Sequence, residues 1–355
     1  MSAAAGLWSA AASARELRPL LARDAVAYLG PARSTNVGDR LLFEALGRLL
    51  PGISLTPVQV EFSIRALARL RSAPAPTPCG VLLGGGTLVG ERRYRHRLER
   101  LVSAGYPLGT LGVGVLEGWP EPGDLREHAL WQPLLEPLGT VPVRGPRSVS
   151  RLERVGIPAT VVGDPVLVFA DPLSDEPDQG LVAVNVGTSN RIAGDPAAYR
   201  TAVTETCRRL VADGWSLQFL VAWPPDEPLT RAIRDEVQPH APIDALISVK
   251  QSFGLLRRCS ALVAMKLHAA VLGVCAGTPV IMTSYQDKCD DFMESIGLGS
   301  RALPLRDIDA GKLHPLVVSA LADTRVRETQ AAAVRSLRAT LVSAADEQLR
   351  RIATW

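Results

Sequence analysis

Short apolar runs alternate with segments of helical periodicity along almost the whole chain. In the first half, the pattern predicts strands at residues 25–30, 53–58, 80–85, 108–114, 141–144 and 159–169. Helices are predicted between them, at residues 39–50, 62–71, 93–104, 124–135 and 146–155. Strands that are apolar throughout and alternate with helices are typical of a parallel sheet covered on both faces.

A polar segment rich in proline and aspartate, residues 170–180, interrupts the alternation and is the best linker candidate. Strands are then predicted at residues 181–187, 216–223, 243–249, 261–265 and 279–285. The helices between them are predicted at residues 199–213, 228–237, 252–259 and from His268 onward. We therefore expect an α/β protein with doubly wound, Rossmann-like domains over residues 1–172 and 180–312 and a helical C-terminal tail over 313–355. Ligands of such sheets bind outside the carboxyl ends of the strands, which here predicts a site in a cleft between the domains.

Composition narrows the class of protein. The 355 residues suffice for two domains, and 47% hydrophobic with 21% charged residues is ordinary for a large core. The net charge of +3 gives no reason to expect nucleic-acid binding. Five cysteines without CxxC or CxH spacing indicate reduced thiols in a cytoplasmic protein and argue against a zinc site. The Ala-rich N-terminus is a poor signal peptide and predicts a short helix, and without a long apolar run we expect a soluble chain.

The glycine-rich stretch "LLGGGTLVGE" at residues 82–91 follows a predicted strand and is expected to open a helix. It matches neither GxGxxG nor the P-loop pattern, because Val89 and Glu91 occupy the decisive positions. Two interpretations remain: Gly85 and Gly86 let the backbone approach a ligand, or the segment is a tight turn without one.

The polar stretch "STNVGDRLLFEAL" at residues 34–46 joins the first strand to its helix. Asp39 is a good helix N-cap and Asn36 suits a turn, so a structural role explains both. The same loop also points toward the predicted cleft, which makes Asn36 a candidate for substrate binding and Asp39 a candidate catalytic carboxylate.

Charged residues mark three further places. Arg144 ends a predicted strand, where its planar guanidinium suits a carboxylate or phosphate. Asp164 interrupts an apolar run, either as part of a Gly-Asp-Pro turn or as a general acid or base. The arginine-rich segment Arg92–Arg100 is a solvated helix face or, alternatively, a docking patch for an anionic acceptor or a membrane surface.

Lys266 and His268 lie in the most apolar part of the chain, where a strand passes into a helix. Two cationic donors beside a helix N-terminus form a place for an anion, and burying them without a partner would be costly. Tyr285 and Lys288, which follow the next strand, are added as substrate-binding candidates.

Taken in order, these motifs resemble those of the polysaccharide pyruvyltransferase family. The resemblance rests on "NVGD" (36–39), "GGG" (84–86), "VRGPRSVSRLERVGI" (143–157), "GDP" (163–165) and "KLHAAVLGVCAGTPVIMTSYQDKCDDFMESIGL" (266–298). It implies a GT-B-like fold and transfer of a pyruvyl group from phosphoenolpyruvate to two hydroxyls of a sugar. The family's Arg-Leu-His motif, which binds the donor, falls on Lys266, Leu267 and His268, with lysine in place of arginine.

The resemblance further implies that Arg144 binds the donor and that Asp164 is the active-site carboxylate. His268 then serves as acid and Asp164 as base, or the reverse, and the chemistry requires no metal or cofactor. The expected partners are phosphoenolpyruvate and a glycan acceptor, including a lipid-linked one met at the inner face of the membrane. A glycosyltransferase with a nucleotide-sugar donor and a non-catalytic binding protein are the alternatives.

Overall fold

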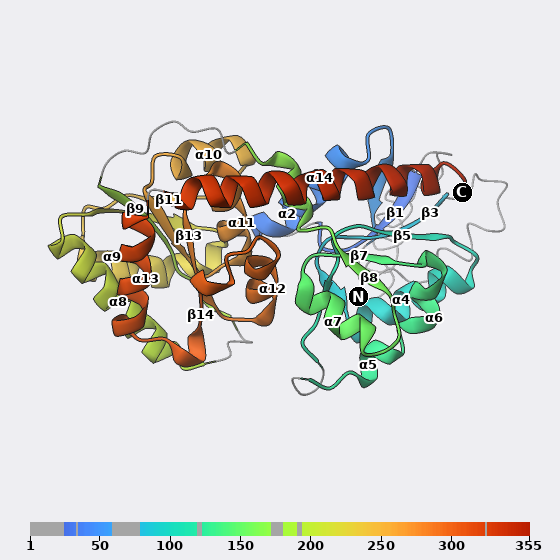
Figure 1. Cartoon of the computed structure of the whole chain (residues 1–355), viewed down its shortest axis with the longest axis horizontal. Helices are drawn as coiled ribbons and strands as arrows, with labels where there is room; N and C mark the ends of the chain where they lie inside the picture. The colour runs from blue at the N-terminus through green and yellow to red at the C-terminus, as the bar shows by residue number, and fades with distance from the viewer. Residues whose placement is uncertain are drawn as a thin grey trace, which may run out of the picture.

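The computed structural model describes residues 25–32, 35–58, 79–118, 123–171, 180–189, 194–323 and 325–355. They form two α/β lobes side by side, with the long C-terminal helix running across both (Figure 1). The helices predicted at the N-terminus and at residues 62–71 lie outside the described residues.

The first domain is built on a parallel sheet. Within the described residues its strand order is β2-β1-β3-β5: β1 Ala25–Leu29, β2 Ser54–Pro57, β3 Gly80–Leu83 and β5 Leu108–Thr110. Two short parallel pairs accompany it: β4 Thr87–Val89 with β6 Gly114–Val115, and β7 Val141–Val143 with β8 Ala159–Val161. The helical segments are α2 Val37–Leu49, α4 Arg92–Ser103, α5 Arg126–Ala129, α6 Gln132–Leu135, η2 Glu136–Leu138, α7 Pro146–Glu153 and η3 Pro165–Phe169.

Three local predictions for this domain are wrong. The glycine turn leads into β4 rather than a helix, because Thr87 pairs with Gly114 and the Gly86 carbonyl accepts a hydrogen bond from the Gly114 N–H. The strand predicted over residues 159–169 ends at Val161, since η3 begins at Pro165. The helix predicted over residues 124–135 is split into α5 and α6, with Pro133 in the first turn of α6.

The second domain holds a larger parallel sheet. Its strand order among the described residues is β11-β10-β9-β12-β13-β14: β9 Leu181–Asn185, β10 Ser216–Val221, β11 Ile243–Ala245, β12 Ala261–Ala264, β13 Val280–Ser284 and β14 Ala302–Pro304. Numbered within the domain this is the order 3-2-1-4-5-6. Strands β10 and β11 are added on one side of β9, and β12 to β14 on the other, so the order of successive strands reverses between β9 and β12 although all strands are parallel. The helices are α8 Pro196–Ala212, α9 Glu227–Val237, α10 Val249–Leu256, α11 Leu267–Ala276, α12 Asp287–Ser295 and α13 Ala310–Ala322, with short turns η4 Pro224–Asp226, η5 Gly299–Arg301 and η6 Leu305–Asp307.

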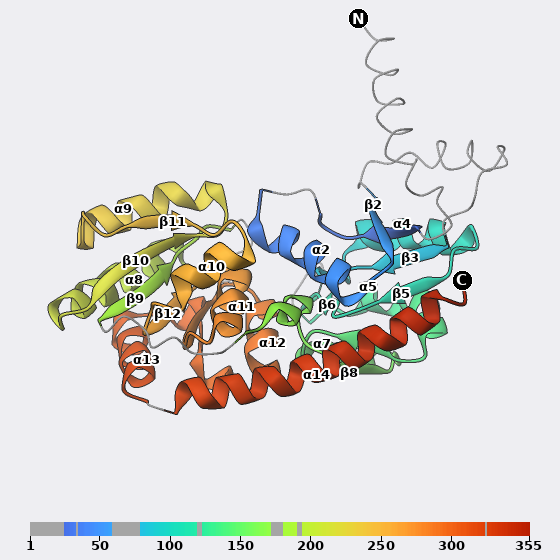
Figure 2. The ribbon, with the colours of Figure 1, turned by 90° about the horizontal axis from the view of Figure 1, so that it is seen from above.

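The expected C-terminal tail is two helices with different positions. Helix α13 packs against α8 in the second domain, whereas α14, Val326–Ile352, runs back along the first (Figure 2). Near its start, Gln330 donates to the Thr278 carbonyl, and near its end Gln348 accepts from the Thr110 N–H of β5. Helix α14 therefore fastens the two domains together.

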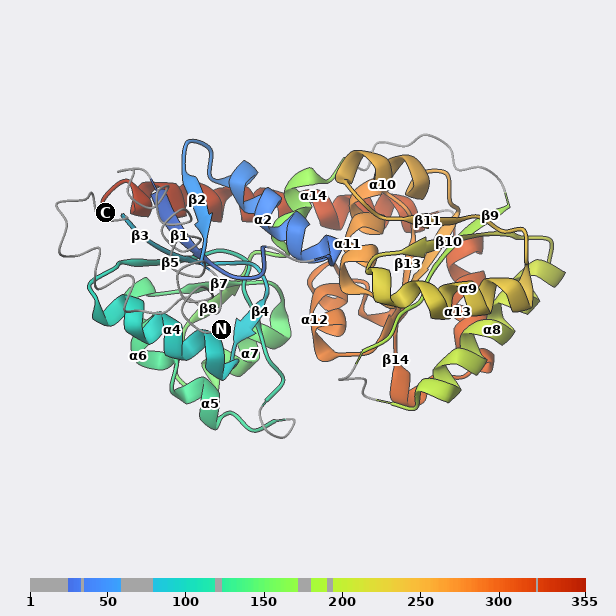
Figure 3. The same ribbon diagram turned by 180° about the vertical axis from the view of Figure 1, so that it is seen from behind.

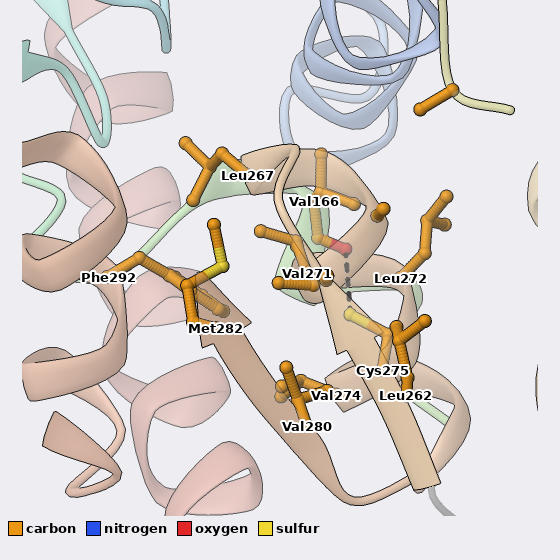
Figure 4. Close-up of a cluster of buried hydrophobic side chains, with 14 of the residues drawn as sticks. Val166, Leu262, Leu267, Val271, Leu272, Val274, Cys275, Val280, Met282 and Phe292 are labelled. Carbon is orange, nitrogen blue, oxygen red and sulfur yellow. Dashed lines mark hydrogen bonds between the residues drawn. The ribbon is translucent and has the colours of Figure 1, made fainter. Parts of the chain in front are cut away.

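One apolar core continues through both domains along α2, η3 and α11. Helix α11 is apolar all round because it is covered on every side, by β12, β13, α10, α14 and η3. In Figure 4 its Cys275 thiol reaches the Val166 carbonyl of η3, with a sulfur–oxygen distance of 3.6 Å. The C-terminal end of α11 is thereby held against η3 of the first domain.

Candidate active site

Three segments that are distant in the sequence meet around His268. The histidine lies in the first turn of α11, and its Nε2 is 3.8 Å from Oδ2 of Asp164, the N-cap of η3. Its Nδ1 side lies over the first turn of α2, where a Cβ on Gly38 would overlap the imidazole ring. Helices α2 and α11 lie next to each other where the domains meet (Figure 3). A glycine at position 38 is thus required for this approach.

Asp164 is fully buried and has partners at both oxygens. Oδ1 accepts the Val166 N–H at 3.0 Å, and Oδ2 lies 3.0 Å from the Nε of Arg144. The guanidinium, only 1% exposed, also donates to the Thr87 hydroxyl at 3.1 Å and to the Gly85 carbonyl at 2.8 Å. Arg144, predicted to clamp a ligand anion, here holds a protein carboxylate.

The surroundings of His268 control its charge. Burial lowers the pKa of His268 below its usual value, while the carboxylates of Asp164 and Asp39 act in the opposite direction. The cations of Arg144 and Lys288 reinforce the lowering. The imidazole is therefore neutral at neutral pH unless an anion arrives beside it.

At the start of α2, Asn36 and Asp39 have different roles from those predicted. The N-cap is Asn36, whose Oδ1 accepts from the Gly38 N–H at 2.9 Å, so the assignment of capping to Asp39 is wrong. Asp39 lies in the first turn of the helix, half-buried, and among the described residues its carboxylate has neither a hydrogen bond nor an ion pair. Asp39 is therefore available to a ligand.

Gly85 and Gly86 are both buried, and protein atoms explain them. A Cβ on Gly85 would come within 2.7 Å of Pro165, and one on Gly86 within 3.0 Å of Leu88. These glycines let the loop after β3 pack against η3 and supply the carbonyl that Arg144 binds. The tight-turn interpretation accounts for the segment.

Lys266 points away from His268, into the second domain. It is the N-cap of α11, and its Nζ donates to the Thr188 carbonyl at 2.5 Å and lies 3.2 Å from Oδ2 of Asp226. The ring centres of Trp223 and Tyr285 are 5.0 and 5.6 Å from the ammonium. Burial lowers the pKa of Lys266, while Asp226 opposes that shift. The adjacent Leu267 is buried in the core.

Tyr285 and Lys288 lie between these two groups of residues. The Tyr285 ring makes cation–π contacts with two lysines. One is with Lys266, and the other is with Lys288, whose Nζ is 5.0 Å from the ring centre. Burial raises the pKa of the Tyr285 hydroxyl well above its usual value, so it stays protonated. Lys288 is half-buried and its charge acts on both His268 and Lys266. These contacts connect the His268 and Lys266 environments.

The family model for "Polysaccharide pyruvyl transferase" matches residues 36–287, which is more than two thirds of the chain. This chain belongs to the polysaccharide pyruvyl transferase family. The match begins at Asn36 and runs through Arg144, Asp164 and His268, so the suspected family is confirmed. No curated protein matches the sequence.

Solved structures similar to this pyruvyl transferase family member show its fold. The Staphylococcus aureus "MnaA-UDP co-structure" superimposes with a TM-score of 0.59 at 11% identity, covering 88% of this chain and 91% of that one. A putative UDP-N-acetylglucosamine 2-epimerase from Listeria monocytogenes gives 0.58 at 12% identity, with the same coverages of 88% and 91%. Anabaena Alr3699/HepE, in complex with UDP and glucose, gives 0.55 at 8% identity over 94% of this chain and 100% of that one. The predicted GT-B-like fold is confirmed.

The domains of this family member are also joined by ion pairs that were not predicted from the sequence. Arg147 of α7 contacts Asp287, Asp290 and Glu294 of α12 at 2.6–3.1 Å. The buried Asp291 accepts from the Ser148 hydroxyl at 2.7 Å and from the N–H groups at the start of α7. Only the acidic composition of residues 287–294 could have signalled this contact in advance.

The arginine-rich segment Arg92–Arg100 lies on α4 in the first domain. Arg95 is buried and paired with Glu127 at 2.5 Å and with Glu99, and Arg93 lies 3.5 Å from Glu91. Part of the predicted basic patch is thus neutralised by the protein's own carboxylates. Within the described residues no helix is long and apolar enough to cross a membrane, and no group of three or more His, Cys, Asp or Glu side chains could hold a metal ion.

Proposed function

We propose that this protein transfers the pyruvyl group of phosphoenolpyruvate onto two hydroxyls of a sugar in a polysaccharide or its precursor, releasing phosphate. The observation that carries the proposal is the convergence of family-matched segments on one histidine. His268, Asp164 and Gly38 come from α11, η3 and α2, and each lies inside the matched residues 36–287.

The reaction has two steps. A sugar hydroxyl adds to C2 of the enol while C3 takes up a proton, which gives a tetrahedral phosphate-bearing carbon. A second hydroxyl then displaces the phosphate, and its proton leaves with that group, so that the product is a cyclic ketal. The site must therefore protonate carbon, accept a hydroxyl proton and stabilise a strongly anionic donor.

His268 is the proposed acid that protonates C3. Its Nε2 faces Asp164 and its Nδ1 side lies over Gly38 of α2, so we propose that the substrate reaches the part of the ring, 13% of the side chain, that stays exposed between them. Asp164 is fully buried and occupied by Arg144 and the Val166 N–H, so we assign it the orientation of His268 rather than contact with the acceptor. Hydrogen bonds in a catalytic array are often long without substrate, and 3.8 Å is compatible with tightening on binding. Arg144 then influences the donor through Asp164.

Asp39 is the proposed base for the acceptor hydroxyl. It is half-buried and without an ion-pair partner among the described residues, and its charge acts on His268 and Tyr285. The donor's anionic groups are assigned to Lys288 and to the N-termini of α2 and α11, which meet beside the histidine. Tyr285, kept protonated by burial, is a further donor for a phosphate oxygen.

The acceptor is a glycan or glycan precursor, including a lipid-linked one, and we propose that it is modified in the cytoplasm. A membrane-associated acceptor would meet the exposed residues Arg92, Arg93 and Arg100 of α4. The protein's partly neutralised helix favours weak contact with a membrane over stable binding, since Arg95 is already paired.

The experiment is release of inorganic phosphate from phosphoenolpyruvate in the presence of a panel of sugar acceptors, with the ketal identified by mass spectrometry. Phosphate release that depends on the acceptor supports the proposal. Turnover or stabilisation by a nucleotide sugar, with none by phosphoenolpyruvate, would instead identify a glycosyltransferase. No turnover and no binding of either donor would identify a binding protein on the same fold.

A further inference from the structure

Lys266, the first residue of the Lys-Leu-His motif, forms a buried ion pair with Asp226 that is separate from the His268 site. Asp226, in the short turn after β10, is fully buried, and its Oδ1 accepts the N–H of Thr188 at 2.8 Å and the hydroxyl of Thr188 at 3.0 Å. Its other oxygen, Oδ2, has the ammonium of Lys266 at 3.2 Å as its cation. Because an uncompensated buried carboxylate is costly, Asp226 requires Lys266 for its charge balance.

Other protein groups surround the Lys266 side chain on its remaining sides. The Thr188 carbonyl and the rings of Trp223 and Tyr285 take up the ammonium, and the side chain is 10% exposed. Gly187 lies against the lysine stem, where a Cβ would overlap Cε. The Lys266 ammonium is thus saturated by protein groups, and little of it is open to a donor anion.

The place of this pair in the sheet connects it to His268. Thr188 follows β9 and Lys266 follows β12. These are the two neighbouring strands between which the strand order reverses. The Lys266 N–H donates to Oδ1 of Asn185 at 3.0 Å, so both its backbone and its side chain are fixed to the end of β9. Lys266 is the N-cap of α11, and His268 is two residues further on. Fixing the cap fixes the turn that carries the histidine.

We propose that the Lys266–Asp226 pair is a positioning device for His268, and that Lys266 is not a ligand of the donor. The pair sets the start of α11 by joining it to the end of β9. Lys266 stands where the family has arginine. It pairs with Asp226 and packs against Gly187, and we propose that it does not contact the substrate. This inference rests on the proposed function for the catalytic role of His268, but the pairing itself does not.

A double-mutant cycle tests it, with Lys266→Met, Asp226→Asn and the double variant compared with the unmodified protein. Each single change leaves one buried charge without its partner, so we expect kcat to fall about 100-fold and the Tm to drop. In the double variant no charge is stranded, and the amide introduced at position 226 can still pair with Thr188. We expect kcat within about 5-fold of the unmodified protein and an unchanged Kd for phosphoenolpyruvate.

Two further readouts separate positioning from donor binding. Carbon-13-labelled histidine, followed by NMR, should report a shifted His268 pKa in both single variants and its return in the double variant. Weaker phosphoenolpyruvate binding than in the unmodified protein, by a similar factor in Lys266→Met and in the double variant, would overturn the inference, because the lysine would then be a donor ligand. A gain in donor affinity in Lys266→Arg would overturn it as well.

The two proposals fail in distinguishable ways. If the unmodified protein neither binds nor turns over phosphoenolpyruvate, the proposed function falls. The recovery of Tm and of the His268 titration in the double variant still decides whether the pair positions the histidine, since neither measurement uses a substrate. Additive losses of Tm in the double variant would refute the pairing.

Discussion

His268 and Lys266 are two residues apart, yet each belongs to a different buried cluster with its own carboxylate. The carboxylate of Asp164 reaches His268 from the first domain and is balanced by Arg144. The carboxylate of Asp226 reaches Lys266 from within the second domain. Residues at the start of a helix point to different sides, so one short motif can serve a reaction and its own placement at once.

The two clusters also differ in what remains open. In the Lys266 cluster, the ammonium is covered by Asp226, Thr188 and two aromatic rings. Around His268, Asp39 is half-buried without a protein partner among the described residues, and the imidazole is 13% exposed. Chemistry is therefore expected at the histidine and not at the lysine.

The largest expected effect is on turnover by His268→Ala. Loss of the proposed acid should lower kcat by about 10⁴-fold, and the variant should remain folded because Asp164 keeps its partner Arg144. His240→Ala, an exposed histidine in the second domain, is the matched control and should retain full activity. Phosphate release measures both, and a His268→Ala enzyme of normal rate would falsify the catalytic assignment.

The sequence predicted the doubly wound domains and the position of His268 well, because both follow from apolar patterning and from a strand–helix junction. Side-chain partners that are distant in the sequence were less visible. Asp164 and Arg144 were both singled out, but not as partners of each other, since nothing in "VPVRGPR" shows that the turn before Asp164 folds back onto it. Asp226 was missed entirely, because an aspartate in "WPPDEP" is typical of an exposed turn.

The second prediction compares a buried arginine, Arg144, with a partly exposed one, Arg147. Arg144→Met leaves Asp164 buried without a charge partner and should reduce the free energy of unfolding by about 3–5 kcal/mol. Arg147→Met is the control: that arginine is 36% exposed, and its loss should cost about 1 kcal/mol or less. Urea unfolding gives both values. Equal, small losses would mean that Asp164 does not depend on Arg144.

The third prediction concerns the approach of α2 to the histidine. A Cβ at Gly38 would overlap the imidazole, so Gly38→Ala should displace His268 and lower kcat about 100-fold. Gly47→Ala in the same helix has no atom within 4 Å of the added carbon. It should gain up to about 1 kcal/mol of stability at unchanged kcat. If the two variants have equal rates, His268 does not rest on α2 during the reaction.

The smallest expected effect is a shift in pH dependence, and it sharpens the role of His268. Burial lowers the pKa of the imidazole in the free protein, whereas an anionic donor bound beside it favours the charged form. The pKa seen in kcat should therefore lie about one unit above the pKa seen in kcat/KM. As an acid, His268 must be protonated, so kcat should fall as the pH rises through that value. If kcat instead rises with pH, His268 acts as the base, and a carboxyl group must then act as the acid.

The same pKa shift predicts a stability change without substrate. The pKa of His268 is lower in the folded protein than its usual 6.5, so the unfolded chain takes up a proton first as the pH falls. Stability should therefore decrease as the pH drops from about 6.5 through the lowered folded pKa, and it should be unaffected by this residue above 6.5. In His268→Gln that part of the pH dependence should vanish, as measured by urea unfolding at a series of pH values. A slope that persists in the variant would place its origin in other groups.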